Sequence, residues 1–353
     1  MEKYVLNETP LRTSNNFGIN NIEIVLDIPS KKTFNGFNVI TEDISKIKLN
    51  VKEEILNKKG TFLKSSIGLN RNVNYIVKVN IPENTIINEN IKLEFNIDED
   101  NDYLVEDIEI VIGKNSSANF EILYNMQEKD IKAFHNGLLD VKLKEGAKSK
   151  VVISNMLNHL SDNIFEIQNE LSENANLEYI LIDFGGKTKI SKYNTKCIGD
   201  NSKNLLNVIY LGKEKDVIDI NYIIETYGIK SQAYINVQGA LANFSKKNFK
   251  GTIDFKEGSK KSVGKENENC MILSKDATSK SLPMLLCHEE DVEGEHGVSC
   301  GKIDEKKLFY IMTKGINYND AKKLIIKANF SGILEKIDDD ELKDIVDNEI
   351  SKI

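Results

Sequence analysis

The chain has 353 residues, of which 40% are apolar and 29% charged, and its formal net charge at pH 7 is -8. These proportions are typical of a globular protein with one large core or two to three smaller units. Lysine and arginine are spread along the chain, which disfavours nucleic acid and anionic membranes as partners, because both are bound mainly through basic patches. No apolar run is long enough to span a bilayer and the start lacks a signal-peptide core, so we expect a cytoplasmic protein.

The four cysteines are Cys197, Cys270, Cys287 and Cys300. They are too few and too scattered for a disulfide framework in a chain of this length, and none belongs to a Cys-x-x-Cys pair. We therefore expect reduced, partly buried thiols. Three of them fall in a short stretch that also holds two of the four histidines, which makes that stretch a candidate for metal chemistry.

A polar turn containing Gly or Asn, followed by an apolar strand, recurs down the middle of the chain with a period of roughly 25–32 residues. Gly and Asn tolerate positive φ in such turns, and Ile, Val, Leu and Tyr suit the strands. Coils of this kind cannot bury their apolar faces alone, so we predict an all-β stack with one continuous core. A β-sandwich stays open as the alternative. The repeated units are Asn88–Ile97, Gly113–Tyr124, Glu145–Ile153, Glu173–Ile182, Gly199–Tyr210, Gly228–Val237 and Glu257–Val263.

Residues 1–85 also show strand patterns, at Asn21–Asp27, Ile44–Val51 and Tyr75–Ile81. Their spacing fits the repeat less well, so we interpret this segment as a β-rich lead-in to a core at residues 86–303. The same segment could also form the first coils of the stack.

From Asp304 onward the apolar period changes from two to about 3.6, which predicts helices in residues 304–353. Asp304 is a predicted N-cap and Gly315 a predicted C-terminal turn residue. A second helix is expected near Asn319 and a third from Asp338, where a run of acidic residues favours a helix N-terminus. The apolar face of this segment either packs on the body or docks a partner, and the pattern alone leaves both open.

The sequence Phe184–Thr188 ends like a phosphate-binding loop, but Leu181 stands where such a loop needs its first glycine. No Gly-x-Ser-x-Gly elbow and no His-Glu-x-x-His metal helix is present. These motifs therefore give no candidate catalytic site, and if ATP drives the system, a partner must hydrolyse it.

The stretch Cys287–Gly301 concentrates thiol, imidazole and carboxylate groups, which are the ligands that iron and zinc use. In an alternating strand His296 shares a face with Gly294 and Val298, away from Glu295. Two interpretations stay open at this point. One is a metal site, and the other is an acidic, solvated turn with a core-facing histidine.

The same stretch resembles the SufB/SufD family of iron–sulfur cluster assembly proteins. The family motif reads roughly Asp-Val-x-x-x-His-Gly-x-x-x-Gly-x-Ile/Leu-Asp followed by Leu-Phe-Tyr, and a Ser-Arg-Gly-Ile sequence comes after it. The resemblance is dense from Phe249 to Ile337. The matching residues here are Asp291-Val292, His296-Gly297, Gly301, Ile303-Asp304, Leu308-Phe309-Tyr310 and Thr313-Lys314-Gly315-Ile316.

The resemblance implies a right-handed parallel β-helix followed by a C-terminal helical segment, residues 304–353, that docks an ATPase. It implies a non-enzymatic subunit that works with a SufC-type ABC ATPase and a SufB-type scaffold. The iron–sulfur cluster would be transient and shared with that partner. The partner-binding residues that it implies are Leu308, Phe309, Tyr310, Gly315, Leu324 and Phe330.

His296 matches the family's histidine, which lies where the SufB-type and SufD-type subunits meet, so the resemblance makes it the candidate contact to the iron–sulfur site. Cys300 has no counterpart in the family motif. It is close enough in sequence to His296 to be an accessory ligand, although a plain thiol is the alternative.

Two departures favour the SufD-type subunit. SufB-type scaffolds carry a cysteine six residues before the proline matched by Pro283 and a glutamate directly after the motif histidine, whereas this chain has Ala277 and Gly297. The alternative is a SufB-like scaffold that builds the cluster in its own homodimer, using His296 with Cys300 or Cys287. A β-helix enzyme acting on polysaccharide is the remaining, disfavoured alternative.

Overall fold

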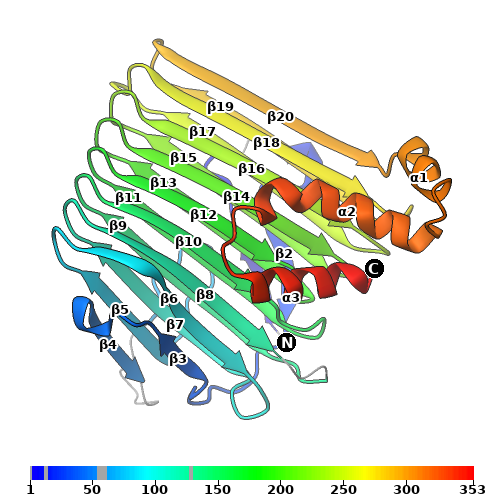
Figure 1. Cartoon of the computed structure of the whole chain (residues 1–353), viewed down its shortest axis with the longest axis horizontal. Helices are drawn as coiled ribbons and strands as arrows, with labels where there is room; N and C mark the ends of the chain where they lie inside the picture. Colours follow the sequence, from blue (N-terminus) through cyan, green and yellow to red (C-terminus); the bar gives the residue numbers. More distant parts are fainter. Residues whose placement is uncertain (1, 12–14, 54–61, 127–129) are drawn as a thin grey trace.

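Two nine-stranded sheets face one another and form a β-solenoid (Figure 1). The computed structural model describes residues 2–11, 15–53, 62–126 and 130–353. From β5 to β20 successive strands alternate between the sheets, so each strand pairs in parallel with the strand two positions later in the chain. The predicted β-helix architecture is therefore confirmed.

We call the sheets the odd sheet and the even sheet, after their solenoid strands. The odd sheet consists of β4 (Lys48–Glu53), β5 (Tyr75–Ile81), β7 (Tyr103–Ile112), β9 (Phe134–Leu143), β11 (Asp162–Leu171), β13 (Thr188–Cys197), β15 (Val217–Thr226), β17 (Lys246–Phe255) and β19 (Thr278–Cys287). The even sheet consists of β3 (Phe37–Ile40), β6 (Ile86–Ile97), β8 (Ser117–Met126), β10 (Lys148–Asn155), β12 (Asn176–Asp183), β14 (Lys203–Gly212), β16 (Gln232–Leu241), β18 (Ser262–Ile272) and β20 (Val292–Lys302).

The register of the sheets confirms the repeat read from the sequence. Lys148 pairs with Ser117 on one side and with Asn176 on the other, at offsets of 31 and 28 residues. β5 lies inside the predicted lead-in segment, yet it pairs in parallel with β7 and so takes part in the stack.

Seven successive corners, each leading into an even-numbered strand, contain a residue with positive φ one or two positions before that strand. The amide of that residue donates to a carbonyl oxygen of the next coil at 2.5–2.9 Å, which produces a ladder along the corner. Most of these positions hold Asn or Gly, the residues that adopt this conformation at least cost, as the sequence predicted. The seven residues are Asn84, Asn115, Gly146, Asn174, Asn201, Lys230 and Lys261.

The space between the sheets, the lumen, is filled by apolar side chains of both sheets. Helices α2 (Tyr318–Leu334) and α3 (Asp340–Ser351) cover the outer face of the even sheet (Figure 1). The antiparallel pair β1 (Glu2–Leu6) and β2 (Ile22–Leu26) packs on the outer face of the odd sheet. The N-terminal and C-terminal segments thus cover opposite faces of the solenoid.

The C-terminal helices begin where their capping residues predict. Asp304 accepts hydrogen bonds from the amides of Lys306 and Lys307 and caps α1 (Glu305–Met312), and Gly315 follows with φ of +90°. Asn317 and Asp339 cap α2 and α3. Among the described residues, no helix has the length and apolar character needed to cross a membrane.

One predicted strand was partly wrong. Within Ile44–Val51 only the second half is extended, in β4, while Ile44–Lys46 form a 3₁₀ turn. The amide of Lys46 donates to the carbonyl of Asp43 at 2.9 Å, and the two side chains pair at 2.8 Å. These local contacts stabilise a turn over the extended conformation that the apolar pattern favoured.

Candidate functional site

The C-terminal end of the solenoid is open. β19 and β20 are the last strands of the two sheets, and each is hydrogen-bonded to another strand on one side only within the described residues. No further coil covers β20, so its residues from Glu293 to Lys302 are exposed. The stretch that the sequence singled out therefore lies on a free strand edge.

His296 faces the lumen at this open end. It is the register partner of Glu266, whose side chain is buried in the lumen, and paired residues of parallel strands point to the same side. Glu295 points to the opposite side and pairs with Lys265 at 3.1 Å. The predicted separation of the imidazole from the neighbouring acid is confirmed.

We call this surface the mouth of the lumen. It is formed by residues of β19 and β20 whose register partners point into the core. Both strands contribute polar groups, so the mouth presents hydroxyl, thiol and imidazole side chains. It includes Ser279 and Ser281 of β19, and His296, Val298 and Cys300 of β20.

The four thiols are free and fall into two classes. Cys197 and Cys270 are buried, and burial raises the pKa of Cys197 to about 12 and that of Cys270 to about 11. Cys287 and Cys300 are exposed at the open end. The expectation of reduced, partly buried thiols is thus confirmed for the four cysteines taken together. The exposed thiols of Cys287 and Cys300 are the ones that reagents from solution can reach.

The structure does not bring His296 and Cys300 together. Four residues of strand separate them, which corresponds to about 13 Å. No group of three or more His, Cys, Asp or Glu side chains among the described residues could hold a metal ion. The mouth therefore presents His296 and Cys300 as separate donor groups.

A charged cluster lies in the lumen directly beneath the mouth. Lys247 and Glu268 are fully buried and form an ion pair. Ser281 donates to Glu268 Oε2 at 2.6 Å, and the hydroxyl of Tyr210 donates to Glu268 Oε1 at 3.1 Å. This cluster was not predicted from the sequence. The available signal was the alternation of side chains along β18, because Glu266, Glu268 and Cys270 occupy alternate positions and therefore share one face of the strand.

Glu266 is the unusual member of this layer. Its side chain crosses the lumen to Gly251, where an added Cβ would lie 1.9 Å from Glu266 Oε1. Within the described part of the chain, neither carboxylate oxygen of Glu266 has a hydrogen-bond partner. Burial, together with the charge of Glu268, raises the pKa of Glu266 to about 8. The carboxyl group therefore carries a proton at neutral pH.

This pKa predicts a pH-dependent stability. Between the unfolded pKa of 4.5 and the folded pKa of about 8 the folded chain holds a proton that the unfolded chain releases. The free energy of unfolding should thus fall with rising pH across this window, by about 1.4 kcal/mol per unit at most. Glu266→Gln should reduce the slope in urea titrations, whereas Glu295→Gln, at an exposed site, should leave it unchanged. Burial also raises the pKa of Asp183 and Asp219, so these two carboxyls keep their contribution to the slope in both variants. An unchanged slope in Glu266→Gln would contradict the assignment.

A second surface lies where α1 meets α2. Phe309, Tyr310 and Leu324 are 69%, 62% and 44% exposed, respectively. Tyr310 and Leu324 line a groove of about 580 Å³, together with Met271 of β18 and Ala328. These exposed apolar side chains have no cover within the described chain.

The other predicted partner-binding residues are placed differently. Leu308 is buried between α1 and α2, and Phe330 is buried against Phe184 of the solenoid at a ring distance of 5.8 Å. Gly315 ends α1 with positive φ. These three residues fix the positions of α1 and α2, the helices that form the exposed groove.

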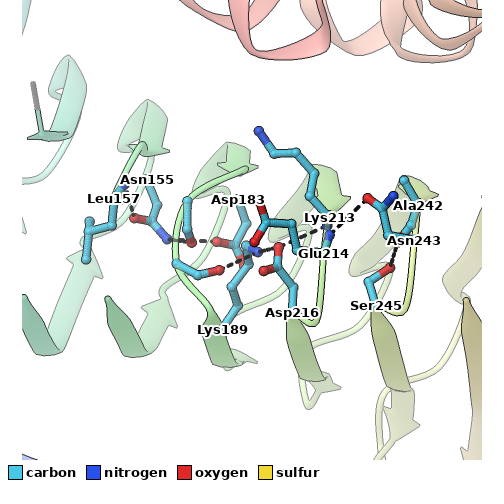
Figure 2. A network of polar contacts seen from close by, with 12 residues as sticks. Asn155, Leu157, Asp183, Lys189, Lys213, Glu214, Asp216, Ala242, Asn243 and Ser245 are labelled. Atoms are coloured by element: carbon cyan, nitrogen blue, oxygen red, sulfur yellow. Dashed lines mark hydrogen bonds and ion pairs between the residues drawn. The ribbon is translucent and has the colours of Figure 1, made fainter. Parts of the chain in front are cut away.

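The segment that resembles a phosphate loop has a structural role. It forms the corner between β12 and β13, where Lys189 donates to the carbonyl of Gly186 and pairs with Asp216, both at 2.7 Å. Asn155 donates to Asp183 at 2.8 Å in the same buried network (Figure 2). Gly186 and Lys189, the residue directly after the segment, thus join neighbouring coils.

Comparison with known proteins identifies the family. A family model described as "SUF system FeS cluster assembly, SufBD core domain" matches residues 95–329, a range that contains the open end and most of α2. The chain is 25% identical to the iron–sulfur cluster assembly protein SufD of Bacillus subtilis over 148 residues, which are 42% of this chain and 34% of the relative. It is 26% identical to SufD of Escherichia coli over 160 residues, or 45% and 38% of the two chains.

An iron–sulfur cluster assembly SufBD family protein of Staphylococcus epidermidis is 22% identical over 250 residues, which are 70% of this chain and 53% of the relative. The matches to these three relatives thus cover between about a third and about half of the relatives' own lengths. The family model, in contrast, matches well over half of this chain. The chain therefore belongs to the SufB/SufD family of SUF iron–sulfur cluster assembly proteins and is SufD-like.

Proposed function

We propose that the chain is a non-enzymatic subunit of a SUF complex, in which its open end meets a SufB-type scaffold and its C-terminal helices dock a SufC-type ABC ATPase. The observation that carries the proposal is the exposed imidazole of His296 on a free strand edge at the mouth of the lumen.

The open end supports the scaffold contact. The free edges of β19 and β20 present unpaired backbone donors and acceptors, which favour addition of strands from another chain. A scaffold with the same coil spacing would extend both sheets at once. Its residues would then lie opposite His296 across the junction.

The donor set at the mouth supports a shared cluster. A neutral imidazole is a good ligand for iron, but a single imidazole does not bind it firmly. Because the described residues contain no group of three metal-binding side chains, the scaffold would supply the remaining ligands. The nascent cluster is the cargo of the complex in this proposal, and His296 contacts it from the SufD-like side.

The groove between α1 and α2 supports the ATPase contact. Exposed aromatic and aliphatic side chains at a concave site are typical of the centre of a protein interface. The chain has no phosphate-binding loop of its own, so ATP hydrolysis would be supplied by the docked partner.

Truncating one of these aromatic side chains should weaken capture of the ATPase. Phe309→Ala and Tyr310→Ala are each expected to lower affinity about tenfold, as truncation of an interface anchor commonly does. Isothermal titration with the SufC-type ATPase of the same genome measures the effect. Phe62→Ala is the matched control, because Phe62 is 60% exposed in the N-terminal segment, which covers the opposite face of the solenoid. Equal affinities of all three variants and the parent would place the ATPase elsewhere.

A homodimeric scaffold is the second candidate, because the same two edges are equally open to a second copy of this chain. Anaerobic reconstitution of the isolated chain with iron and sulfide separates the candidates. A stable visible absorption from a dimer would favour the homodimer. A colourless monomer that yields clusters only after addition of the SufB-type scaffold would favour the heteromer.

A further inference from the structure

Cys270 and Cys300 lie side by side at the open end. They are register partners on the adjacent parallel strands β18 and β20, so both side chains point to the lumen side. Cys270 is 3% exposed and belongs to the core, whereas Cys300 is exposed at the mouth. The proposed contact of His296 with the iron–sulfur cluster gives no role to either cysteine.

The spacing of the strands brings the two thiols within reach of a covalent bond. Neighbouring strands lie about 4.8 Å apart, and disulfides join Cα atoms about 4.4–6.8 Å apart. The Cβ atoms need to approach to about 3.8 Å, which requires a small tilt of one strand. β20 can tilt because it is hydrogen-bonded to a strand on one side only within the described part of the chain.

The surroundings assign different roles to the two thiols. Burial, with a smaller contribution from the neighbouring Cys300, raises the pKa of Cys270 to about 11 against the lowering effect of the Lys247 ammonium. Cys300 is exposed and meets reagents from solution first. Cys270 is then the resolving thiol, since attack requires its deprotonation beside Lys247.

We propose that Cys270 and Cys300 form a reversible disulfide, which cross-links β18 to β20 when the chain meets an oxidised low-molecular-weight disulfide. The Cys300 thiolate attacks that disulfide, forms a mixed disulfide and releases one thiolate. Cys270 then loses its proton and attacks Cys300 Sγ, which releases the second thiolate. The two protein thiols are oxidised, and the small disulfide is reduced to two thiols.

The bond would be a modification of the edge that carries His296. A bond at an exposed strand that must tilt to form it is readily reduced, so it would respond to the thiol pool of the cell. Oxidation would fix β20 against β18 and remove the Cys300 thiol from the mouth.

Incubation of the full chain with oxidised glutathione, followed by alkylation and non-reducing peptide mapping, tests the proposal. The expected product is a cross-linked peptide pair that contains Cys270 and Cys300 and disappears with dithiothreitol. Cys270→Ser should abolish the cross-link and leave Cys300 as a glutathione adduct. Cys300→Ser should leave Cys270 reduced.

Cys287 is the matched control, because it is exposed on the edge strand β19 and its register partner is Phe255. It should form a glutathione adduct alone, and Cys287→Ser should not change the cross-link. If Cys300 of the parent chain accumulates as a glutathione adduct while Cys270 stays reduced, the proposal is overturned. The measurement uses the isolated chain, so either result leaves the proposed scaffold contact to its own test.

Discussion

Replacing His296 by Ala is expected to leave the solenoid folded and to lower the cluster yield of the reconstituted complex by about tenfold or more. The side chain is exposed, so the free energy of unfolding should stay within about 0.5 kcal/mol of the parent. The yield should fall because even residues that only support metal ligands commonly change affinity or activity by about 10–100-fold. Visible absorption after anaerobic assembly with the scaffold and the ATPase measures the yield.

Ser299→Ala is the control for this experiment. Ser299 is exposed on the same strand, but by the alternation of β20 it faces away from the lumen. It should assemble clusters like the parent. A His296→Ala complex with full cluster yield would remove His296 from the site and leave the open end as an interface alone.

Replacing Glu268 by Ala is expected to destabilise the chain by about 3–5 kcal/mol, because it leaves the Lys247 ammonium buried without its counter-charge. Both side chains are fully buried in the lumen, where water cannot compensate the loss. The hydroxyls of Ser281 and Tyr210 would also lose their acceptor. Urea unfolding followed by circular dichroism measures the change.

The exposed pair Lys114–Glu145 provides the comparison, since its side chains are 46% and 50% exposed. Glu145→Ala should cost less than about 1 kcal/mol. Replacing both buried partners, in Lys247→Met with Glu268→Leu, should recover much of the loss. A loss in Glu268→Ala as small as that in Glu145→Ala would show that the lumen admits water at this level.

The parts of the fold that follow from local pattern were predictable. Recurrent Asn or Gly turns and a period near 30 residues indicate stacked coils, because each coil repeats the same geometry, and positive φ is found at the corners that lead into the even-numbered strands from β6 to β18. Asp304, the acidic run from Asp338 and the turn at Gly315 indicate where the helices begin and end. The face of His296 followed from the strand period of two.

The remaining features depend on contacts between distant residues. Asn7 donates to Asp219 at 2.8 Å, and Glu166 accepts from Ser65 at 2.7 Å, so the N-terminal segment is fixed to the odd sheet through buried carboxylates. No local pattern encodes such pairs. The ion pair between Lys247 and Glu268 is equally invisible to local pattern, because charged residues of a strand are expected to face solvent, whereas these two face the lumen.

The two ends of the solenoid differ, and this difference sets how many molecules can join. At the N-terminal end the short strands β3 and β4 run antiparallel to their neighbours and terminate the sheets. Short, reversed edge strands are poor templates for further pairing. If the open end associates as proposed, that association is self-limiting and would yield a closed pair of two solenoids and no fibre.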